Sequence, residues 1–239
     1  MTFKTLLLLF AMCFLLTGCS LWGSIFGESE EEELPPDQLM SEGMENYERG
    51  FYEDANEAFE KIKDRYPYSR FALEAELKLA DTLFKRHEYA EAVEAYQDFE
   101  RLHPKNSHIP YVIYQQGMCH FEQTRGEDRD QAEIMSAREH FERLIKKFPK
   151  SIYARRAERK IRECYIILAE HELYVGRFYY QKRKYRAAYA RFRYVVEKYP
   201  DLGQYHEALE YMAKCKEKIP EEDAEAGGSW WYRLLHPID

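Results

Sequence analysis

Cys19 is the residue whose surroundings most clearly predict chemistry. It follows the small pair Thr17-Gly18 at the end of an apolar run, Leu6 to Leu16, and Lys4 stands just before that run. A cysteine thiol is a nucleophile once it is deprotonated. The run of eleven residues is too short to span a membrane and has the length of a signal-peptide core. The stretch therefore predicts a targeting segment that ends at a reactive cysteine.

The four residues Leu16-Thr17-Gly18-Cys19 resemble the lipobox of bacterial lipoproteins. The resemblance implies that residues 1–18 are a cleaved signal peptide and that Cys19 carries an S-diacylglycerol and an N-acyl group. Several acyl chains give stable anchoring, since each buried methylene contributes about 0.8 kcal/mol. Ser20 is not the aspartate that commonly retains lipoproteins in the inner membrane. We therefore expect an anchor in the outer membrane, on its periplasmic face; a plain secretory leader is the alternative.

No other pattern in the sequence indicates catalysis. The eight histidines are scattered, and HExxH, G-x-S-x-G, Cys-x-x-Cys and a phosphate-binding loop are all missing. We expect a protein that is not an enzyme and that has no metal and no cofactor beyond the lipid on Cys19. Buried free thiols are the simplest expectation for Cys119, Cys164 and Cys215. A bridge between the first two is the alternative.

Charge is distributed unevenly along the chain. The 239 residues carry a formal net charge of −8, which disfavours a nucleic-acid partner. From Glu28 to Glu60 nearly every charge is acidic, whereas basic residues dominate from Arg155 to Lys198. The basic half predicts either a surface for an acidic partner or simply solvated helix faces.

Two segments outside the central region have their own composition. Residues 19–37 hold the lipidated N-terminus and an acidic run that ends in Pro35-Pro36, which predicts an extended, disordered tether. Residues 221–239 are an acidic, glycine-containing linker followed by a Trp-rich tail. That tail either caps the end of the central region or contacts a partner or lipid head groups.

One spacing occurs four times between residues 38 and 220. In each copy an aromatic residue follows an alanine by four positions, and a proline follows the aromatic by eight: Ala55, Phe59, Pro67; Ala92, Tyr96, Pro104; Ala137, Phe141, Pro149; Ala188, Phe192, Pro200. In three copies a tyrosine lies three residues before the alanine and a small residue lies twelve before it: Gly43, Ala80, Gly176. This is the tetratricopeptide-repeat (TPR) pattern.

The pattern has a physical basis. The small residue and the alanine let the two helices of a hairpin approach closely, the aromatic ring fills the remaining gap, and proline ends the second helix. We predict an all-α fold, a TPR α-solenoid of about five helix-turn-helix units. The third unit carries an insertion, TRGEDRDQAEIM, the fourth begins with a long helical stretch from about Ser151 to Gln181, and the fifth is incomplete. A generic helical bundle is the alternative.

Three longer stretches are more specific than the repeat. They are DRYPYSRFALEA, LHPKNSHIPYVIYQQGM, and the region from EDRDQAEIMSAREHFERLIKKFP to RFRYVVEKYPD. Together with the lipobox they resemble the BamD (ComL) family, the TPR lipoproteins of the outer-membrane β-barrel assembly (BAM) machine. The similarity covers roughly Asp37 to Lys218, and the truncated last repeat with its SWWYRLLHPI tail departs from the family.

The resemblance implies a non-enzymatic role. C-terminal repeats dock on the POTRA domains of a BamA-like barrel protein, beside other BAM lipoproteins, and N-terminal repeats receive unfolded outer-membrane proteins. The alternative is a TPR lipoprotein that pilots secretin or pilus assembly or organises cell-wall synthesis.

The same resemblance, together with residue type, suggests candidate binding residues. For unfolded clients these are Arg65, Tyr66, Tyr68 and Tyr47, whose alternative role is packing within the repeats. For the POTRA partner they are Arg191, Arg193 and Arg186. Alignment of ARFRYVVEKYP with the family makes Arg191 the best single candidate. The alternative is an exposed arginine that contributes less than about 1 kcal/mol.

Overall fold

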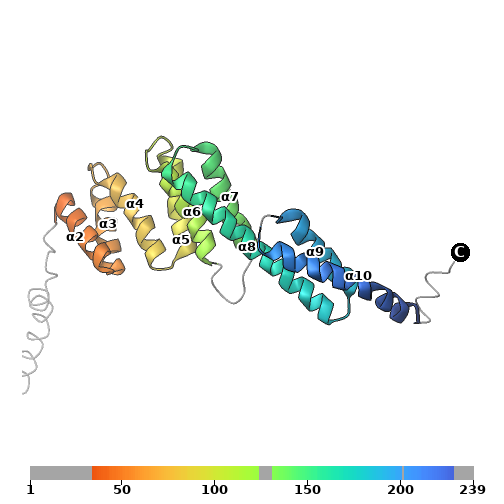
Figure 1. Cartoon of the computed structure of the whole chain (residues 1–239). Coiled ribbons are helices and arrows are strands. Elements are labelled where there is room, and N and C mark those ends of the chain that lie inside the picture. The colour runs from red at the N-terminus through yellow and green to blue at the C-terminus, as the bar shows by residue number, and fades with distance from the viewer. Residues whose placement is uncertain (1–33, 124–130, 201, 229–239) are drawn as a thin grey trace, which may run out of the picture.

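The computed structural model describes residues 34–123, 131–200 and 202–228 (Figure 1). The predicted signal peptide, Cys19 and most of the predicted tether lie outside these residues. So do the Trp-rich segment 229–239 and the first part of the predicted insertion.

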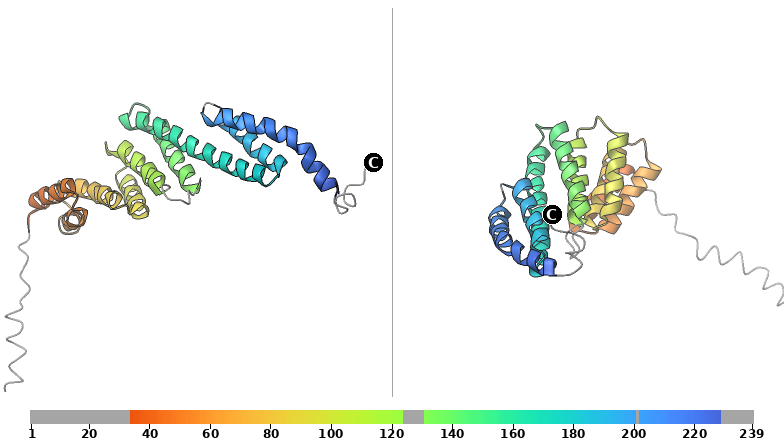
Figure 2. Two further views of the ribbon diagram at one scale, coloured as in Figure 1. Left: turned by 60° about the horizontal axis from the view of Figure 1, so that its bottom comes forward. Right: turned by 90° about the vertical axis from the view of Figure 1, so that its right-hand side faces the viewer.

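The described residues form nine helices and no strand. Their bounds are α2 Pro36–Arg49, α3 Tyr52–Arg65, α4 Ala72–Lys85, α5 Tyr89–Leu102, α6 Ile109–Gln123, α7 Gln131–Lys147, α8 Ile152–Gln181, α9 Tyr185–Lys198 and α10 Gln204–Gly228. Consecutive helices pair into four hairpins, α2–α3, α4–α5, α6–α7 and α8–α9, and α10 stands as a fifth, single-helix unit. Figure 2 shows the hairpins following one another along an elongated array. The predicted TPR solenoid with an incomplete fifth unit is confirmed.

Three of the four hairpins close by placing a glycine against an aromatic ring. A Cβ built on Gly43 would lie 2.6 Å from Phe59 Cε1, and one on Gly176 would lie 2.6 Å from Phe192 Cε1. Both rings are fully buried. Glycine is required here because any side chain would collide with the facing ring.

The third hairpin uses the same contact at a different spacing. A Cβ on Gly117 would lie 2.5 Å from Phe141 Cε1, although the two residues are twenty-four positions apart instead of sixteen. The insertion between α6 and α7 accounts for the eight additional positions. The packing rule is therefore conserved between hairpins while the connection varies.

The turn inside a hairpin also repeats. The backbone enters the left-handed region at Gly50 (φ +83°), His87 (φ +64°) and Arg183 (φ +58°), each two residues before the second helix. Glycine adopts this conformation without strain, whereas histidine and arginine do so at a cost.

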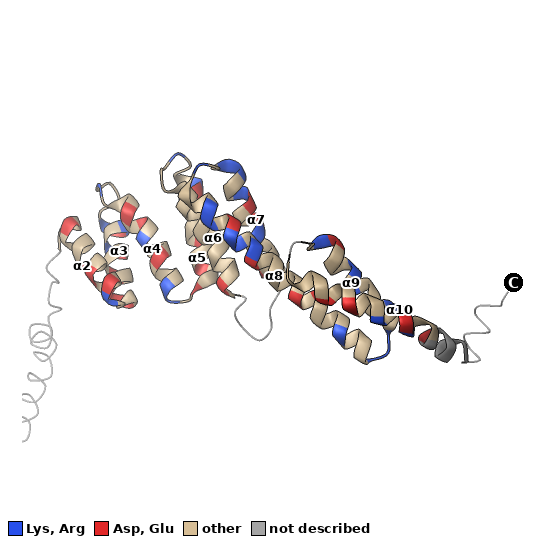
Figure 3. Cartoon of the chain, viewed as in Figure 1, with Lys and Arg blue, Asp and Glu red and all other residues tan. Residues whose placement is uncertain are grey.

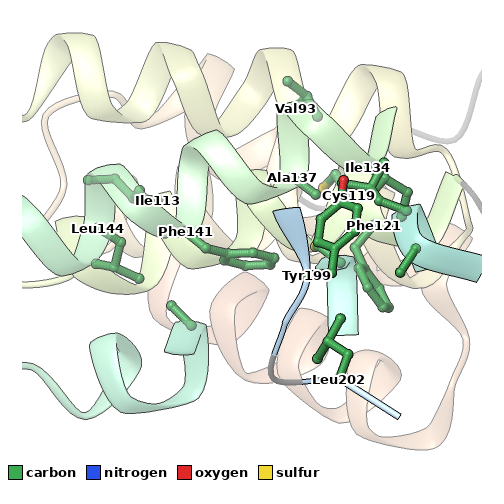
Figure 4. Close-up of a cluster of buried hydrophobic side chains, with 14 of the residues drawn as sticks. Val93, Ile113, Cys119, Phe121, Ile134, Ala137, Phe141, Leu144, Tyr199 and Leu202 are labelled. Atoms are coloured by element: carbon green, nitrogen blue, oxygen red, sulfur yellow. The ribbon is translucent and has the colours of Figure 1, made fainter. Parts of the chain in front are cut away.

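The core is divided into two clusters. A smaller one joins α2, α3 and one side of α4 around Phe59, and a larger one extends from α4 to α10. Figure 4 shows part of the larger cluster, where Ile113 and Cys119 of α6 pack with Ile134 and Phe141 of α7.

Two predicted boundaries need correction. Helix α2 begins at Pro36, so Pro36 and Asp37 form its first turn instead of the end of the tether. Proline suits this position because its missing N–H would have no helical partner there. Helix α10 continues through Pro220 to Gly228, into the predicted linker. Glu222 Oε2 accepts a hydrogen bond from the backbone N–H of Arg186 at 2.9 Å, which ties this extension to α9.

Candidate binding groove on the inner face

The first helices of successive hairpins surround a cavity of about 700 Å³. We call this cavity the inner groove; its walls come from α4, α5, α6, α8 and the connections before α4 and α6. The lining residues are Arg70, Leu73, Glu74, Leu77, Lys78, Asp81, Phe99, Asn106, Ser107, His108, Tyr111 and Tyr153. A TPR array offers its partners such a surface.

The floor of the groove is a buried carboxylate with three donors. Asp81 Oδ1 accepts from Tyr96 Oη at 2.7 Å and from Tyr111 Oη at 2.6 Å, and Lys78 Nζ lies 3.3 Å from Oδ2. Burial, and next the charge of Asp81, raises the pKa of both phenols. The hydroxyls therefore remain protonated donors at any physiological pH, and the floor is a fixed polar network.

One wall of the groove is formed by two tyrosines, Tyr111 and Tyr153, which we call the tyrosine wall. Their rings lie 5.4 Å apart. Behind them, the fully buried Tyr96 lies 6.4 Å from Tyr111, and Tyr114 lies 5.8 Å from Tyr153. The guanidinium of Arg156 lies 5.3 Å from the Tyr153 ring centroid. Such a wall offers flat apolar contact with polar tips, which suits aromatic side chains of an extended peptide.

The three cysteines of the described array are not exposed nucleophiles. Cys119, Cys164 and Cys215 are buried free thiols. Burial raises the pKa of Cys119 and Cys164 to about 12 and that of Cys215 to about 11, so none is poised as a nucleophile. Among the described residues, no three His, Cys, Asp or Glu side chains are placed to hold a metal ion.

The four client-binding candidates do not line the groove. Arg65 ends α3, and Tyr68 is fully exposed in the connection to α4. Tyr66 packs against the smaller core cluster, and its hydroxyl donates to the Leu34 carbonyl at 3.2 Å. Tyr47 is half-buried beside Tyr52, with ring centroids 5.7 Å apart. Tyr66 and Tyr47 therefore take part in packing within the repeats, which was the alternative role considered for them.

The three partner-binding candidates all lie exposed on α9. Arg191 Nη1 lies 3.1 Å from Glu172 Oε2 on α8, and Arg193 Nε lies 3.5 Å from Glu197 on its own helix. Arg186 is in the first turn of α9. Arg186 and Arg193 are seven residues apart and share one side of α9, whereas Arg191 lies on another side of the helix, toward Glu172 of α8. None of the three lines the groove.

Sequence reasoning missed the residues of the groove itself. Two signals were present: DRYPYSRFALEA contains Arg70, and LHPKNSHIPYVIYQQGM contains His108 and Tyr111. A third was an aspartate, Asp81, beside the small Ala80 in an otherwise apolar stretch. None of these signals says that the residues converge, because they come from different helices.

The helical hairpins define a TPR scaffold, and the inner groove is its candidate binding site. Residues 32–228 match the model of the YfiO family, described as outer membrane lipoprotein. The chain belongs to this family.

Relatives with curated names support the assignment over most of the chain. The outer membrane protein assembly factor BamD of Vibrio cholerae is 28% identical over 234 residues, which is 94% of this chain and 95% of the relative. BamD of Rickettsia prowazekii is 32% identical over 182 residues, 76% of this chain and 72% of the relative.

Among solved structures, a tetratricopeptide repeat protein from Parabacteroides merdae is similar with a TM-score of 0.40 at 14% identity. The match covers 85% of this chain and 68% of that protein. In the part of the chain that the structure describes, every helix is too short or too polar to cross a membrane.

Proposed function

We propose that this chain is an outer membrane protein assembly factor, a lipid-anchored TPR scaffold of the BAM machine that receives unfolded β-barrel proteins for insertion. The observation that carries the proposal is the match, over nearly full length, to relatives named as such factors. The role is non-enzymatic. A scaffold with a preformed groove needs only reversible contacts to hand a client on.

The inner groove is the proposed client site, in place of the surface around Tyr47 and Tyr66. Its tyrosine wall fits the aromatic side chains of an unfolded barrel strand. Arg70, Asn106 and His108 at its edge supply hydrogen-bond donors for an extended backbone. Arg65 and Tyr68 lie on and beside the connection that carries Arg70, and in this proposal they extend the approach to the groove.

Docking on the barrel-forming subunit is assigned to α9. Arg186, Arg191 and Arg193 are exposed on this helix and offer guanidinium groups to carboxylates of a POTRA domain. The anchor is the lipid on Cys19, which holds the chain at the periplasmic face of the outer membrane. Residues 20–33 then provide the distance between lipid and array.

Partner identity tests this function. The tagged full chain is extracted from outer membranes in mild detergent, and the proteins that co-purify are identified. We expect a POTRA-containing barrel protein in stoichiometric amount, with further lipoproteins. A secretin or a cell-wall synthase in its place would overturn the assembly role and support the alternative function.

Site-specific crosslinking tests the client site. A photoreactive residue replaces Tyr153 in the groove or, as a control, the exposed Tyr194 on α9. We expect unfolded outer-membrane proteins to crosslink to position 153 and not to position 194. Equal crosslinking at both positions would show that clients do not select the groove.

A further inference from the structure

The first half of α8, which contributes Tyr153 to the inner groove, also carries several arginines. Arg155, Arg156 and Arg159 are all exposed there, in a chain whose net charge is −8. Figure 3 shows Lys and Arg gathered on this part of α8 and on the adjoining end of α7. We call these three arginines the basic edge.

The basic edge adjoins the tyrosine wall. Arg156 lies over the ring of Tyr153, which lines the groove, at 5.3 Å from the centroid. Arg156 is thus the residue that joins the basic edge to the groove.

The basic edge is not neutralised within the described residues. Two other cations of α8 and α9 are paired: Lys160 with Glu163 at 2.6 Å, and Arg191 with Glu172 at 3.1 Å. Arg155, Arg156 and Arg159 form no such ion pair in the described ranges. A partner carboxylate can therefore bind a guanidinium of this edge without displacing an internal one.

We propose that the groove selects client segments in which acidic side chains lie next to aromatic ones. The aromatic side chains stack on the tyrosine wall, and the carboxylates pair with the basic edge. A segment with lysine at the same positions is repelled, so the edge gives specificity as well as affinity. This inference rests on the proposed function and adds the chemistry of the client to it.

Three synthetic peptides test the proposal. They share one length and one alternating aromatic pattern, and their polar positions are all Glu, all Gln or all Lys. Fluorescence anisotropy measures their binding to the full chain in detergent. We expect affinity to fall in the order Glu, Gln, Lys, with at least a tenfold difference between the extremes. The difference should shrink at high salt because exposed charges are screened.

A matched pair of variants locates the effect. Arg156→Glu with Arg159→Glu reverses two charges of the basic edge, and we expect it to reverse the order of the peptides. Lys184→Glu with Lys198→Glu makes the same change of net charge at exposed lysines at the two ends of α9, and the original order should remain. Circular dichroism establishes that both variants fold. If the reversal unfolds the chain, Arg156→Gln and Arg159→Gln replace it, and each should weaken the Glu peptide alone.

The outcomes separate this inference from the function on which it rests. Equal binding of all three peptides overturns the charge selection and leaves the groove as a client site. Binding of none contradicts the groove itself. If the Glu peptide binds only after residues 28–33 are deleted, the acidic stretch of this chain occupies the basic edge. That result would overturn the proposal that the edge binds carboxylates of a client.

Discussion

Nη1 of Arg191 lies 3.1 Å from Oε2 of Glu172, so the arginine that the sequence suggests for partner docking is also paired within its own hairpin. The Glu172 side chain is 12% exposed and that of Arg191 is 46% exposed. A guanidinium has five N–H donors, and this pair uses one nitrogen of the group. The remaining donors are available to a carboxylate of a partner.

Docking and pairing can be separated by two substitutions. Arg191→Glu places two carboxylates together and removes the donor, so we expect co-purification of the barrel partner to fall at least tenfold. Glu172→Gln breaks only the internal charge pair and leaves Arg191 free to bind. We expect it to retain the partner and to lower the free energy of unfolding by less than about 1 kcal/mol. Equal loss of the partner in both variants would mean that the pair acts only on local structure.

The glycines at the hairpin contacts predict sharp differences between chemically identical substitutions. Gly176→Ala places a Cβ 2.6 Å from Phe192 Cε1, and relieving this overlap should destabilise the chain by about 1–3 kcal/mol. Gly203→Ala adds the same methyl where nothing lies within 4 Å, and it should be close to neutral. Urea denaturation measures both. Indistinguishable midpoints would refute the packing argument.

The repeats were predictable because each offset in the sequence corresponds to one contact. Gly43 with Phe59 and Gly176 with Phe192 follow directly from the spacing. Gly117 was not assigned, since the insertion moves it eight residues further from its aromatic partner. The start of α2 and the end of α10 were misplaced because both depend on how a helix tolerates a proline, and composition alone does not reveal that.

The groove was not predictable in the same way. Asp81, Tyr111 and Tyr153 come from three helices, and only the stacking of hairpins brings them to one cavity. Tyrosine adds a further difficulty, since it occurs both in TPR packing and on binding surfaces. The resemblance together with residue type suggested Tyr66 and Tyr47, and in the structure both pack against the smaller core cluster.

The anchor predicted at Cys19 is tested by fractionation. Cys19→Ala removes the thiol that would form the thioether, and the residue lies outside the described array. We expect the helical circular dichroism of the variant to be unchanged and the protein to leave the membrane fraction. If the variant still sediments with membranes, either protein contacts suffice for attachment or Cys19 is not the anchor.

Asp81 connects the stability of the array to the shape of the groove. Asp81→Ala leaves the hydroxyls of Tyr96 and Tyr111 without their acceptor, and Lys78 without its counter-charge. We expect a loss of about 2–4 kcal/mol in the free energy of unfolding, because three donors lose one buried partner. Asp81→Asn keeps one acceptor oxygen and should cost less. Thermal melts compare the two variants. An unchanged melting temperature for the alanine variant would contradict the claim that Asp81 stabilises the array.

His140 on α7 predicts how stability depends on pH. Burial, followed by the charges of Arg143 and His120, lowers its pKa to about 4 from 6.5. Its Nδ1 lies 3.2 Å from Nη2 of Arg143, and its ring stacks on His120 with centroids 5.1 Å apart. A neutral ring can accept a hydrogen bond from the guanidinium, whereas a protonated ring is repelled by it.

The folded chain therefore binds this proton less readily than the unfolded chain does. Its contribution to stability is fully present above about pH 6.5 and is lost progressively as the pH falls toward 4. Because the ring is partly exposed, we expect a loss of about 1–2 kcal/mol instead of the full value of the shift. Denaturation at pH 7 and pH 4.5 should show this loss in the wild type and a smaller one in His140→Gln. His206→Gln, at an exposed histidine of α10, is the control and should behave as the wild type. An identical pH dependence in all three chains would place the acid sensitivity elsewhere in the array.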